Sequence, residues 1–171
     1  MGMTLSARPK EASERVDGAE WKPRERGVLC FVVKAGKILL IEKKRGLGAG
    51  KVNGPGGRIE AGETDEQAAV RETQEEVGIT PTGVEWAGEL RFQFRDGYSL
   101  QCTVYRASGW QGELMETEEA KPFWMGTNQI PYERMWADDV KWMPRLLAGE
   151  KFRGWFEFEG DRMEWFRMEP A

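Results

Sequence analysis

A helix with sharply defined ends, predicted within residues 57–79, constrains the fold of this chain more than any other feature. Thr64 is suited to the N-cap position, and Gln67, three residues later, completes a capping box with it. Gly78 is the residue type that most often follows the last turn of a helix. We therefore predict a helix over residues 64–77, around which the rest of the chain must be arranged.

Three glutamates crowd onto one face of this helix. Glu72, Glu75 and Glu76 stand at positions i, i+3 and i+4, where side chains are neighbours and like charges repel. Arg71 is the only nearby cation on that face, so a divalent metal ion explains the missing positive charge. Oxygen ligands of this kind favour Mg²⁺ or Mn²⁺. Taken alone, the cluster is also compatible with a solvated acidic surface.

Glu63 and Arg71 suggest a structural brace beside the cluster. An arginine fork suits bidentate pairing with a carboxylate. This pair would fix the loop that presents Gly56 and Gly57, whose small size lets a backbone carbonyl or N–H approach a metal or a phosphate. For Gly56 a tight turn is the simpler alternative.

The chain contains no histidine, which excludes His-based catalytic triads and imidazole metal sites. Its net charge of −4 gives no basic excess and argues against long nucleic acid as a partner. A small anion that needs a metal fits better.

Cys30 and Cys102 are the only cysteines, and each lies in an apolar, strand-like run. A disulfide framework and the usual zinc sites are therefore excluded, which predicts a reducing, cytoplasmic location. No apolar run approaches the roughly 18–20 residues that span a bilayer, and no secretion signal is visible. We expect no membrane association and a monomer, although the sequence leaves oligomers open.

The pattern of apolar residues predicts an α/β fold. Residues 1–26 are polar, so we predict an N-terminal extension, able to pack through Trp21, before one domain over residues 27–171. A second helix is predicted over residues 138–148, and residues 46–57 are too rich in turn formers for regular structure. Strands are predicted at 27–33, 37–41, 83–94, 99–106 and 123–125, with a last aromatic hairpin at 151–168. Together these elements predict a mixed β-sheet sandwiched between α-helices.

A glycine-rich stretch at residues 46–51 superficially suggests a P-loop. Arg45 stands where the first glycine belongs, and Val52 replaces the Ser or Thr that would hold magnesium, so we reject that interpretation. Lys43, Lys44 and Arg45 form a basic cluster ahead of this stretch. They could meet phosphates, or they could be the solvated end of a strand.

The acidic helix and its flanks resemble the signature of the Nudix hydrolases. The matching positions are Gly57, Glu63, Arg71, Glu72, Glu75, Glu76, Gly78 and Ile79. Thr73 occupies a position that is bulky and apolar in the signature, a departure that affects packing and leaves the chemistry unchanged. Scattered matches over residues 27–168 resemble the oxidised-purine nucleoside triphosphatases of MutT-homologue type. They include Lys43, Lys44, Arg45, Gly46, Asn53, Gly54, Met135, Trp136, Asp138 and Asp139.

This resemblance implies the Nudix fold, a magnesium-dependent active site and a purine pocket. The implied metal set is the Gly56 carbonyl, Glu72, Glu75 and Glu76, with Glu119, rather than Glu116 or Glu118, as a further ligand or base. The implied substrate contacts are Lys43 near the phosphates, Gly56 and Gly57 at the backbone approach, Asn53, Asp138 and Asp139 at the purine edge, and Phe92 and Trp136 as walls.

Adjacent carboxylates in a partly dry aromatic pocket should have pKa values pushed apart, so that one donates while the other accepts. Alternatively, Asp138 and Asp139 cap the following helix, and both roles can coexist. Val28, Leu47 and Ala120 depart from the subfamily pattern, in which a hydroxyl-bearing residue, an aromatic residue and a methionine stand there. These departures leave the preferred base open.

The reaction implied by the resemblance is hydrolysis of oxidised or otherwise modified purine nucleoside triphosphates to nucleoside monophosphate and pyrophosphate, which sanitises the nucleotide pool. One glutamate would activate a water molecule. The alternatives are ADP-ribose, a nucleotide sugar, a dinucleoside polyphosphate, an RNA 5′ end, an unmodified triphosphate, or a nucleotide-binding module without catalysis.

Overall fold

The computed structural model describes residues 15–171 and contains two α-helices, α1 (Asp65–Val77) and α2 (Asp139–Leu147), with a short 3₁₀ helix at Tyr132–Arg134. The strands are β1 (Glu25–Lys34), β2 (Lys37–Lys43), β3 (Val52–Asn53), β4 (Gly56–Arg58), β5 (Thr80–Thr82), β6 (Glu85–Phe94), β7 (Ser99–Ala107), β8 (Gly109–Gln111), β9 (Ala120–Gly126), β10 (Phe152–Glu159) and β11 (Arg162–Pro170).

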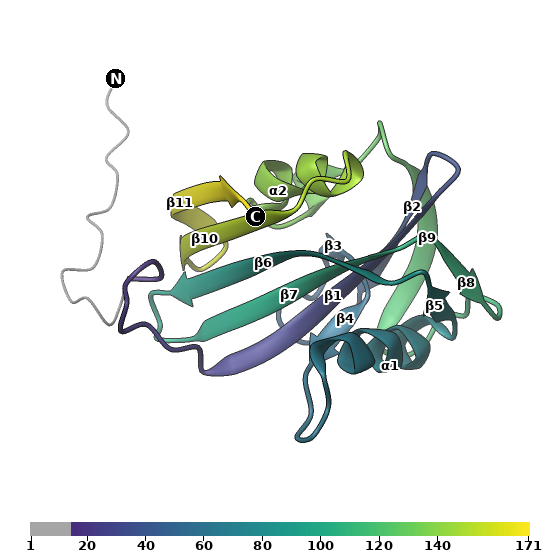
Figure 1. The fold of residues 1–171 in the computed structure, drawn as a ribbon, viewed down its shortest axis with the longest axis horizontal. Coiled ribbons are helices and arrows are strands. Elements are labelled where there is room, and N and C mark those ends of the chain that lie inside the picture. Colours follow the sequence, from purple (N-terminus) through teal and green to yellow (C-terminus); the bar gives the residue numbers. More distant parts are fainter. Residues whose placement is uncertain (1–14) are drawn as a thin grey trace.

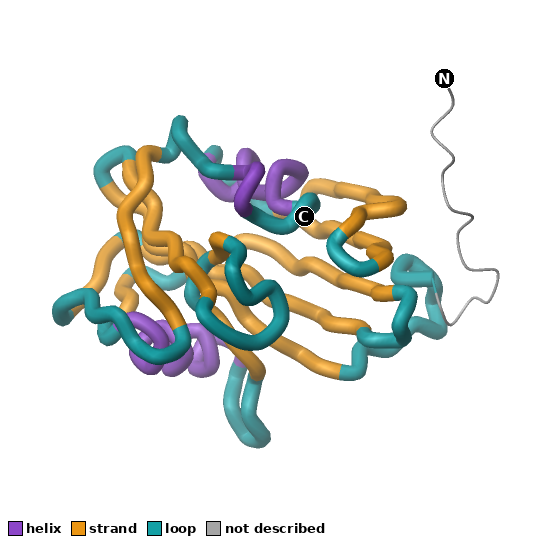
Figure 2. The backbone as a smooth tube through the Cα atoms, turned by 180° about the vertical axis from the view of Figure 1, so that it is seen from behind, coloured by secondary structure: helices purple, strands orange, loops and turns teal. Residues whose placement is uncertain are grey.

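A mixed β-sheet forms the centre of the molecule, as predicted. Its strand order is β11-β10-β6-β7-β1-β2-β3, with β4 added beside β1 and β9 beside β2. β1 pairs with β7, and β6 with β10, in parallel, whereas the other pairs are antiparallel. The two helices lie on opposite sides of the strands (Figures 1 and 2). The predicted Nudix architecture of a sheet between helices is confirmed.

Strands β1 and β2 form a hairpin that is paired over only part of its length. The two strands pair at only Val33–Ile38 and Lys34–Lys37. Beyond these pairs, β1 continues beside β4 and β7, whereas β2 continues beside β3 and β9. Residues of both branches line the cavity described below.

Burial on both faces explains why β1 and β2 appear in the sequence as continuous apolar runs. Phe31, Ile38 and Leu40 pack in the core with Trp142 and Met143 of α2. The alternate residues Cys30, Leu39 and Ile41 pack in the core with Ala68, Ala69 and Val77 of α1. Because strand side chains point to opposite faces in turn, a strand covered on both sides needs apolar residues at every position.

Helix α1 has the caps that its sequence predicts. Thr64 Oγ1 accepts a hydrogen bond from the Gln67 N–H at 3.1 Å, and Gln67 Oε1 accepts one from the Thr64 N–H at 2.9 Å. Gly78 ends the helix in the left-handed region, with φ of 81°. Thr73 is fully buried, and its hydroxyl donates back to the Ala69 carbonyl at 2.7 Å, so the polar group in this packing position is satisfied.

Several short strands were not predicted. The glycine-rich segment contains β3 and β4, because the edges of β2 and β1 supply them with ladder partners. A separate two-stranded sheet joins β5 to β8. Strands of two or three residues are too short to show a period of two in the sequence. β9 is longer than the predicted run because its first residues pair with the end of β2.

The N-terminal segment packs on the sheet from residue 15 onward, whereas residues 1–14 of the predicted extension lie outside the described residues. Val16 is fully buried, and its N–H donates to Glu157 Oε2 at 3.1 Å. Trp21 is buried and donates from Nε1 to Gln93 Oε1 at 2.8 Å, the kind of packing that the sequence allowed for Trp21. Within residues 15–171, neither helix has the length and apolar character needed to cross a membrane.

We predict that Gly78→Ala lowers the free energy of unfolding more than Gly149→Ala does. Both glycines follow a helix with positive φ, of 81° and 76°, so both substitutions carry a conformational penalty of about 1–2 kcal/mol. A Cβ at Gly78 would also collide with the Met115 side chain, whereas one at Gly149 would meet open space. The extra penalty at Gly78 should be about 1 kcal/mol. Urea unfolding measures both losses, and equal losses would contradict the collision.

Candidate active site

Helix α1 presents its glutamates to strand β4. The Gly56 backbone lies close enough to Glu76 to lower the pKa of its carboxyl group against the effect of burial, and Glu72 lies so close to Gly57 that a Cβ there would overlap its carboxyl group. A Cβ on Gly56 would collide with the Val28 carbonyl oxygen. Gly56 is part of a strand paired with β1, so the tight-turn alternative for it is wrong. The predicted close approach of backbone to this cluster is present.

Arg71 forms the predicted pair with Glu63. Its Nε and one terminal nitrogen donate to the two Glu63 oxygens at 2.6 and 2.9 Å, and the same terminal nitrogen donates to the Arg58 carbonyl at 3.0 Å. These hydrogen bonds hold the pKa of Glu63 down at about 2. The remaining terminal nitrogen donates to Glu72 at 2.9 Å and to Glu75 at 3.1 Å. Arg71 therefore fixes the loop and also neutralises part of the acidic cluster.

The carboxylates suit a divalent cation. Glu76 is 6% exposed, and its Oε2 atom is buried without a hydrogen-bond partner among residues 15–171. Burial raises the pKa of Glu76 to about 8, and the charge of Glu72 contributes to that rise. Burial also raises the pKa of Glu72. An orphaned oxygen in an oxygen-only donor set fits a hard cation, which would restore the charged form.

Closing these donors around an ion requires side-chain movement. Within the described part of the chain, no three acidic side chains are already gathered in a metal-binding arrangement. Glu72 and Glu75 are both engaged by Arg71, at 2.9 and 3.1 Å. A rotation of Glu75 would release it from Arg71, because its side chain is 55% exposed and has room to turn.

Glu119 joins the cluster from the loop before β9. Of the three glutamates in this loop, it is the one that lines the cavity, and its charge contributes to the raised pKa of Glu76. Arg45 contacts its Oε1 at 3.1 Å. Glu116 instead pairs with Lys44 at 2.7 Å, and Glu118 is 92% exposed. The position of Glu119 thus agrees with its selection from the sequence.

The three basic residues at the end of β2 make different contacts. Lys43 lines the cavity, and its charge lowers the pKa of Glu76 against the effect of burial. Lys44 and Arg45 turn toward the loop that carries Glu119. Lys44 and Arg45 are 36% and 60% exposed, so the alternative of a solvated strand end describes them in part, although Lys43 and Arg45 also line the cavity.

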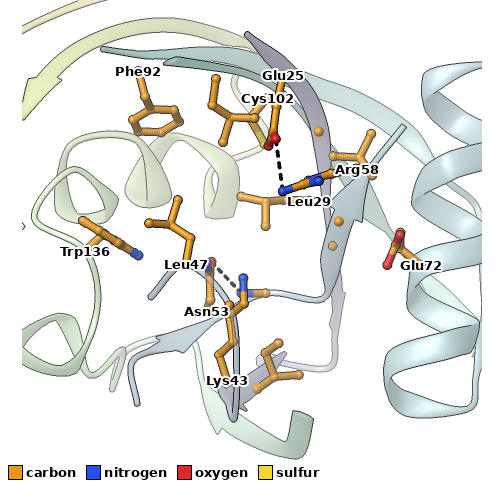
Figure 3. A pocket seen from close by; sticks show the side chains of 18 of the residues that line it. Glu25, Leu29, Lys43, Leu47, Asn53, Arg58, Glu72, Phe92, Cys102 and Trp136 are labelled. Carbon is orange, nitrogen blue, oxygen red and sulfur yellow. Dashed lines mark hydrogen bonds and ion pairs between the residues drawn. The ribbon is translucent and has the colours of Figure 1, made fainter. Parts of the chain in front are cut away.

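A cavity of about 480 Å³ connects the carboxylates to an aromatic end. Figure 3 shows Glu72 on its helix at one side, Trp136 and Phe92 at the other, and Asn53 and Lys43 between them. Phe94 packs edge-on against Trp136, with ring centroids 5.9 Å apart. The Lys51 ammonium lies 5.2 Å from the centroid of the Trp136 ring. One cavity therefore holds the metal-binding and base-binding residues predicted from the sequence.

Asp138 and Asp139 lie buried at the aromatic end. Asp138 accepts a hydrogen bond from Trp142 Nε1 at 2.8 Å, whereas Asp139 Oδ2 has no partner among residues 15–171. Burial raises the pKa of both groups, and that of Asp139 rises further because Asp138 is beside it. Asp138 occupies the N-cap position of α2 but makes no side-chain capping bond. The side-chain capping bond that the sequence allowed is therefore absent, whereas both residues do lie at the N-terminal end of α2.

Asn53 and the three departures from the subfamily pattern have distinct positions. Asn53 Oδ1 accepts from the Gly54 N–H at 2.9 Å, which leaves the amide NH₂ group as the donor for a ligand. Val28 and Leu47 line the cavity. Ala120 does not line it but packs in the core beside α1. Val28 and Leu47 can therefore affect the cavity directly, whereas Ala120 can affect it only through its packing.

Comparison with known proteins agrees with this geometry. A family model described as "NUDIX domain" matches residues 23–146. The chain belongs to the Nudix family. It is 44% identical over 133 residues to the oxidized purine nucleoside triphosphate hydrolase of Danio rerio, which covers 77% of this chain and 85% of the relative. The enzyme of the same name from Mus musculus is 39% identical over 132 residues, with the same coverage.

The fold has a solved counterpart among the Nudix proteins. The crystal structure of the MutT protein from Bacillus halodurans superposes with a TM-score of 0.77 at 27% identity, covering 85% of this chain and 97% of that one. Nudix proteins are hydrolases of small nucleotide substrates and generally need a divalent metal. The oxygen-only carboxylate cluster of this Nudix hydrolase is consistent with that requirement.

Some cavity residues of this Nudix hydrolase were not identified from its sequence. Glu25 accepts from the Tyr98 hydroxyl at 2.7 Å and pairs with Arg58 at 3.0 Å, and all three line the cavity. Leu29, Phe94 and Cys102 also line it. Of these residues, Phe94 could have been predicted from strand alternation: it stands two residues after Phe92, so both side chains point to the same face of the strand. Residues 25, 58 and 98 carry no comparable signal, since their proximity depends on strand pairing.

We predict that Asp139→Asn stabilises the protein increasingly as the pH rises. The folded-state pKa of Asp139 lies well above the value of about 3.9 for an exposed aspartate. The stability that this group contributes is complete below that lower value and is lost as pH rises through the folded-state pKa. Asparagine does not titrate, so the advantage in unfolding free energy should grow as the pH is raised from about 4 toward neutral. Urea unfolding across this range measures it, and an advantage that shrinks with pH would refute the assignment.

Proposed function

We propose that this Nudix hydrolase converts oxidised or otherwise modified purine nucleoside triphosphates to nucleoside monophosphate and pyrophosphate, with Mg²⁺ or Mn²⁺ as cofactor. The observation that carries this proposal is the single cavity that joins the acidic cluster to the buried Asp138–Asp139 pair. A triphosphate would lie at the first end and a purine at the second. The names of the zebrafish and mouse relatives support the same substrate class.

The carboxylates of Glu72, Glu75, Glu76 and Glu119, with the Gly56 carbonyl, would hold the metal. When bound, a divalent ion supplies charge neutralisation for the phosphate chain and lowers the pKa of a water molecule. A glutamate of the cluster, such as Glu76, accepts the proton of the attacking water. Lys43 places a positive charge beside the phosphates, and Arg71 keeps the cluster in place.

The aromatic end would select the base by shape and by hydrogen bonding. Trp136 and Phe92 provide flat apolar walls for a purine ring. Burial and the neighbouring Asp138 raise the pKa of Asp139, which favours its protonated form as a donor to a base acceptor, while Asp138 and Asn53 supply an acceptor and a donor. Such a mixed set suits both an oxidised guanine and a modified adenine.

We also propose that the enzyme acts as a cytoplasmic monomer on free nucleotides, without binding long nucleic acid or a membrane. The two thiols, Cys30 and Cys102, are buried and unpaired, in keeping with a reducing compartment. The net charge of −4 disfavours a polyanionic surface as a partner.

We predict that 8-oxo-dGTP, 2-hydroxy-dATP or a methylated purine triphosphate is hydrolysed with a higher kcat/KM than dGTP or ADP-ribose. The buried pair with one protonated member favours a modified purine edge over an ordinary one. A panel of these five nucleotide types with Mg²⁺, analysed for monophosphate and pyrophosphate, measures the preference. Cleavage of ADP-ribose above all others would assign the site to a different Nudix substrate. Absence of cleavage throughout would favour a binding module.

Glu76→Gln should reduce kcat by at least about a hundredfold while the fold is retained, because the cluster loses a metal ligand and a base. Glu66→Gln is the matched control, since Glu66 is an exposed residue in the first turn of the same helix. Steady-state kinetics and circular dichroism measure the two effects. Full activity of Glu76→Gln would remove the acidic helix from the mechanism.

A further inference from the structure

A loop distant in sequence caps the C-terminal end of α1. The last carbonyls of a helix have no partner within it and must be satisfied by other groups. The Met115 N–H donates to the Val77 carbonyl at 3.0 Å. The Thr117 hydroxyl donates to the Glu76 carbonyl at 2.8 Å. The loop is thereby attached to the turn of the helix that carries Glu76.

The same hydroxyl fixes the backbone at Glu119. Thr117 Oγ1 accepts from the Glu119 N–H at 3.2 Å and from the Ala120 N–H at 3.3 Å. A hydroxyl has one donor and two acceptor sites, so Thr117 uses its full capacity. A single oxygen atom is therefore bonded to the backbone of two acidic residues that face the same end of the cavity.

Lys44 attaches this loop to strand β2. Its ammonium donates to the Thr117 carbonyl at 2.8 Å and to Glu116 at 2.7 Å, and its backbone N–H donates to the Glu119 carbonyl at 2.9 Å. These bonds hold the loop between α1 and β2, beside Lys43. The loop is joined to α1 by the Met115–Val77 bond and by the Thr117 hydroxyl, and of these two only the hydroxyl also bonds the backbone of Glu119.

We propose that Thr117 is a positioning residue whose hydroxyl sets the spacing between Glu76 on α1 and Glu119 on the loop before β9. This inference rests on the proposed function, in which both glutamates serve the metal site. The Glu119 side chain is 44% exposed and lies on a loop, so its own packing does not fix it. A metal site needs its donors held closely in place by neighbouring groups, and Thr117 links these two through their backbones.

Two substitutions at one position test this role. Thr117→Val keeps the side-chain shape and removes all three hydrogen bonds, whereas Thr117→Ser retains the hydroxyl. The matched control is Thr80→Val, because Thr80 Oγ1 also bonds α1, accepting from Gln74 Nε2 at 2.8 Å, but on a part of the helix that does not line the cavity.

We predict that Thr117→Val weakens Mn²⁺ binding about tenfold in calorimetric titration without nucleotide, and lowers kcat by about tenfold with little change in KM. Thr117→Ser should restore both values to within about twofold, and Thr80→Val should match the wild type. The Mn²⁺ titration does not depend on the choice of nucleotide. The KM-against-kcat split distinguishes positioning of the metal site from a damaged substrate pocket.

Results that contradict this inference can be distinguished from results that contradict the proposed function. If Thr117→Val binds Mn²⁺ and turns over like an active wild type, or if Thr117→Ser fails to rescue it, the inference is wrong and the proposed function stands. Thr117→Ala provides a second deletion of the hydroxyl, and loss of folding in both deletions would assign the group to stability alone. A wild type that neither binds Mn²⁺ nor cleaves any nucleotide would overturn the proposed function together with this inference.

Discussion

The guanidinium of Arg71 donates hydrogen bonds to four groups that belong to three segments of the chain: the carboxylates of Glu63, Glu72 and Glu75, and the Arg58 carbonyl. Its planar fork and fixed charge suit this task, which a lysine could fulfil only in part. The glycines of β4 can lie against Glu72 and Glu76 because the loop that follows them is fixed in this way. Without the guanidinium, the clustered carboxylates would repel one another and the loop would lose three hydrogen bonds to the helix.

The beginning of α1 is set by residues close in sequence, whereas its end also depends on residues far away in the sequence. Its beginning is determined by Thr64 and Gln67, a few residues apart, and was therefore predicted from the sequence. Its end was also predicted, from Gly78, but the groups that satisfy its last carbonyls come from Met115 and Thr117. No local pattern identifies such partners, because they are brought to the helix by the pairing of β9 with β2.

The predicted site residues follow from local sequence patterns or from a family resemblance, whereas the missed ones depend on contacts between distant segments. The glutamates and the Arg71 brace follow from helical spacing, and Asp138 with Trp136 follows from resemblance to a subfamily. Glu25, Arg58 and Tyr98 meet only because β1 lies between β4 and β7, a strand order that the sequence does not reveal. For Asp138 and Asp139 the sequence left capping and ligand binding open, and the structure adds that both are buried and that Asp138 makes no side-chain capping bond.

The two ends of the cavity rest on different elements. The carboxylate end is built from α1, β4 and the loop before β9, whereas the aromatic end is built from β3, β6 and the residues that lead into α2. Leu47 lies on a loop and is 46% exposed, so a change there alters the wall of the base pocket without moving a carboxylate. The carboxylate end and the aromatic end are therefore separable in this fold, which is why the acidic helix identifies the family but does not determine what the opposite end of the cavity accepts.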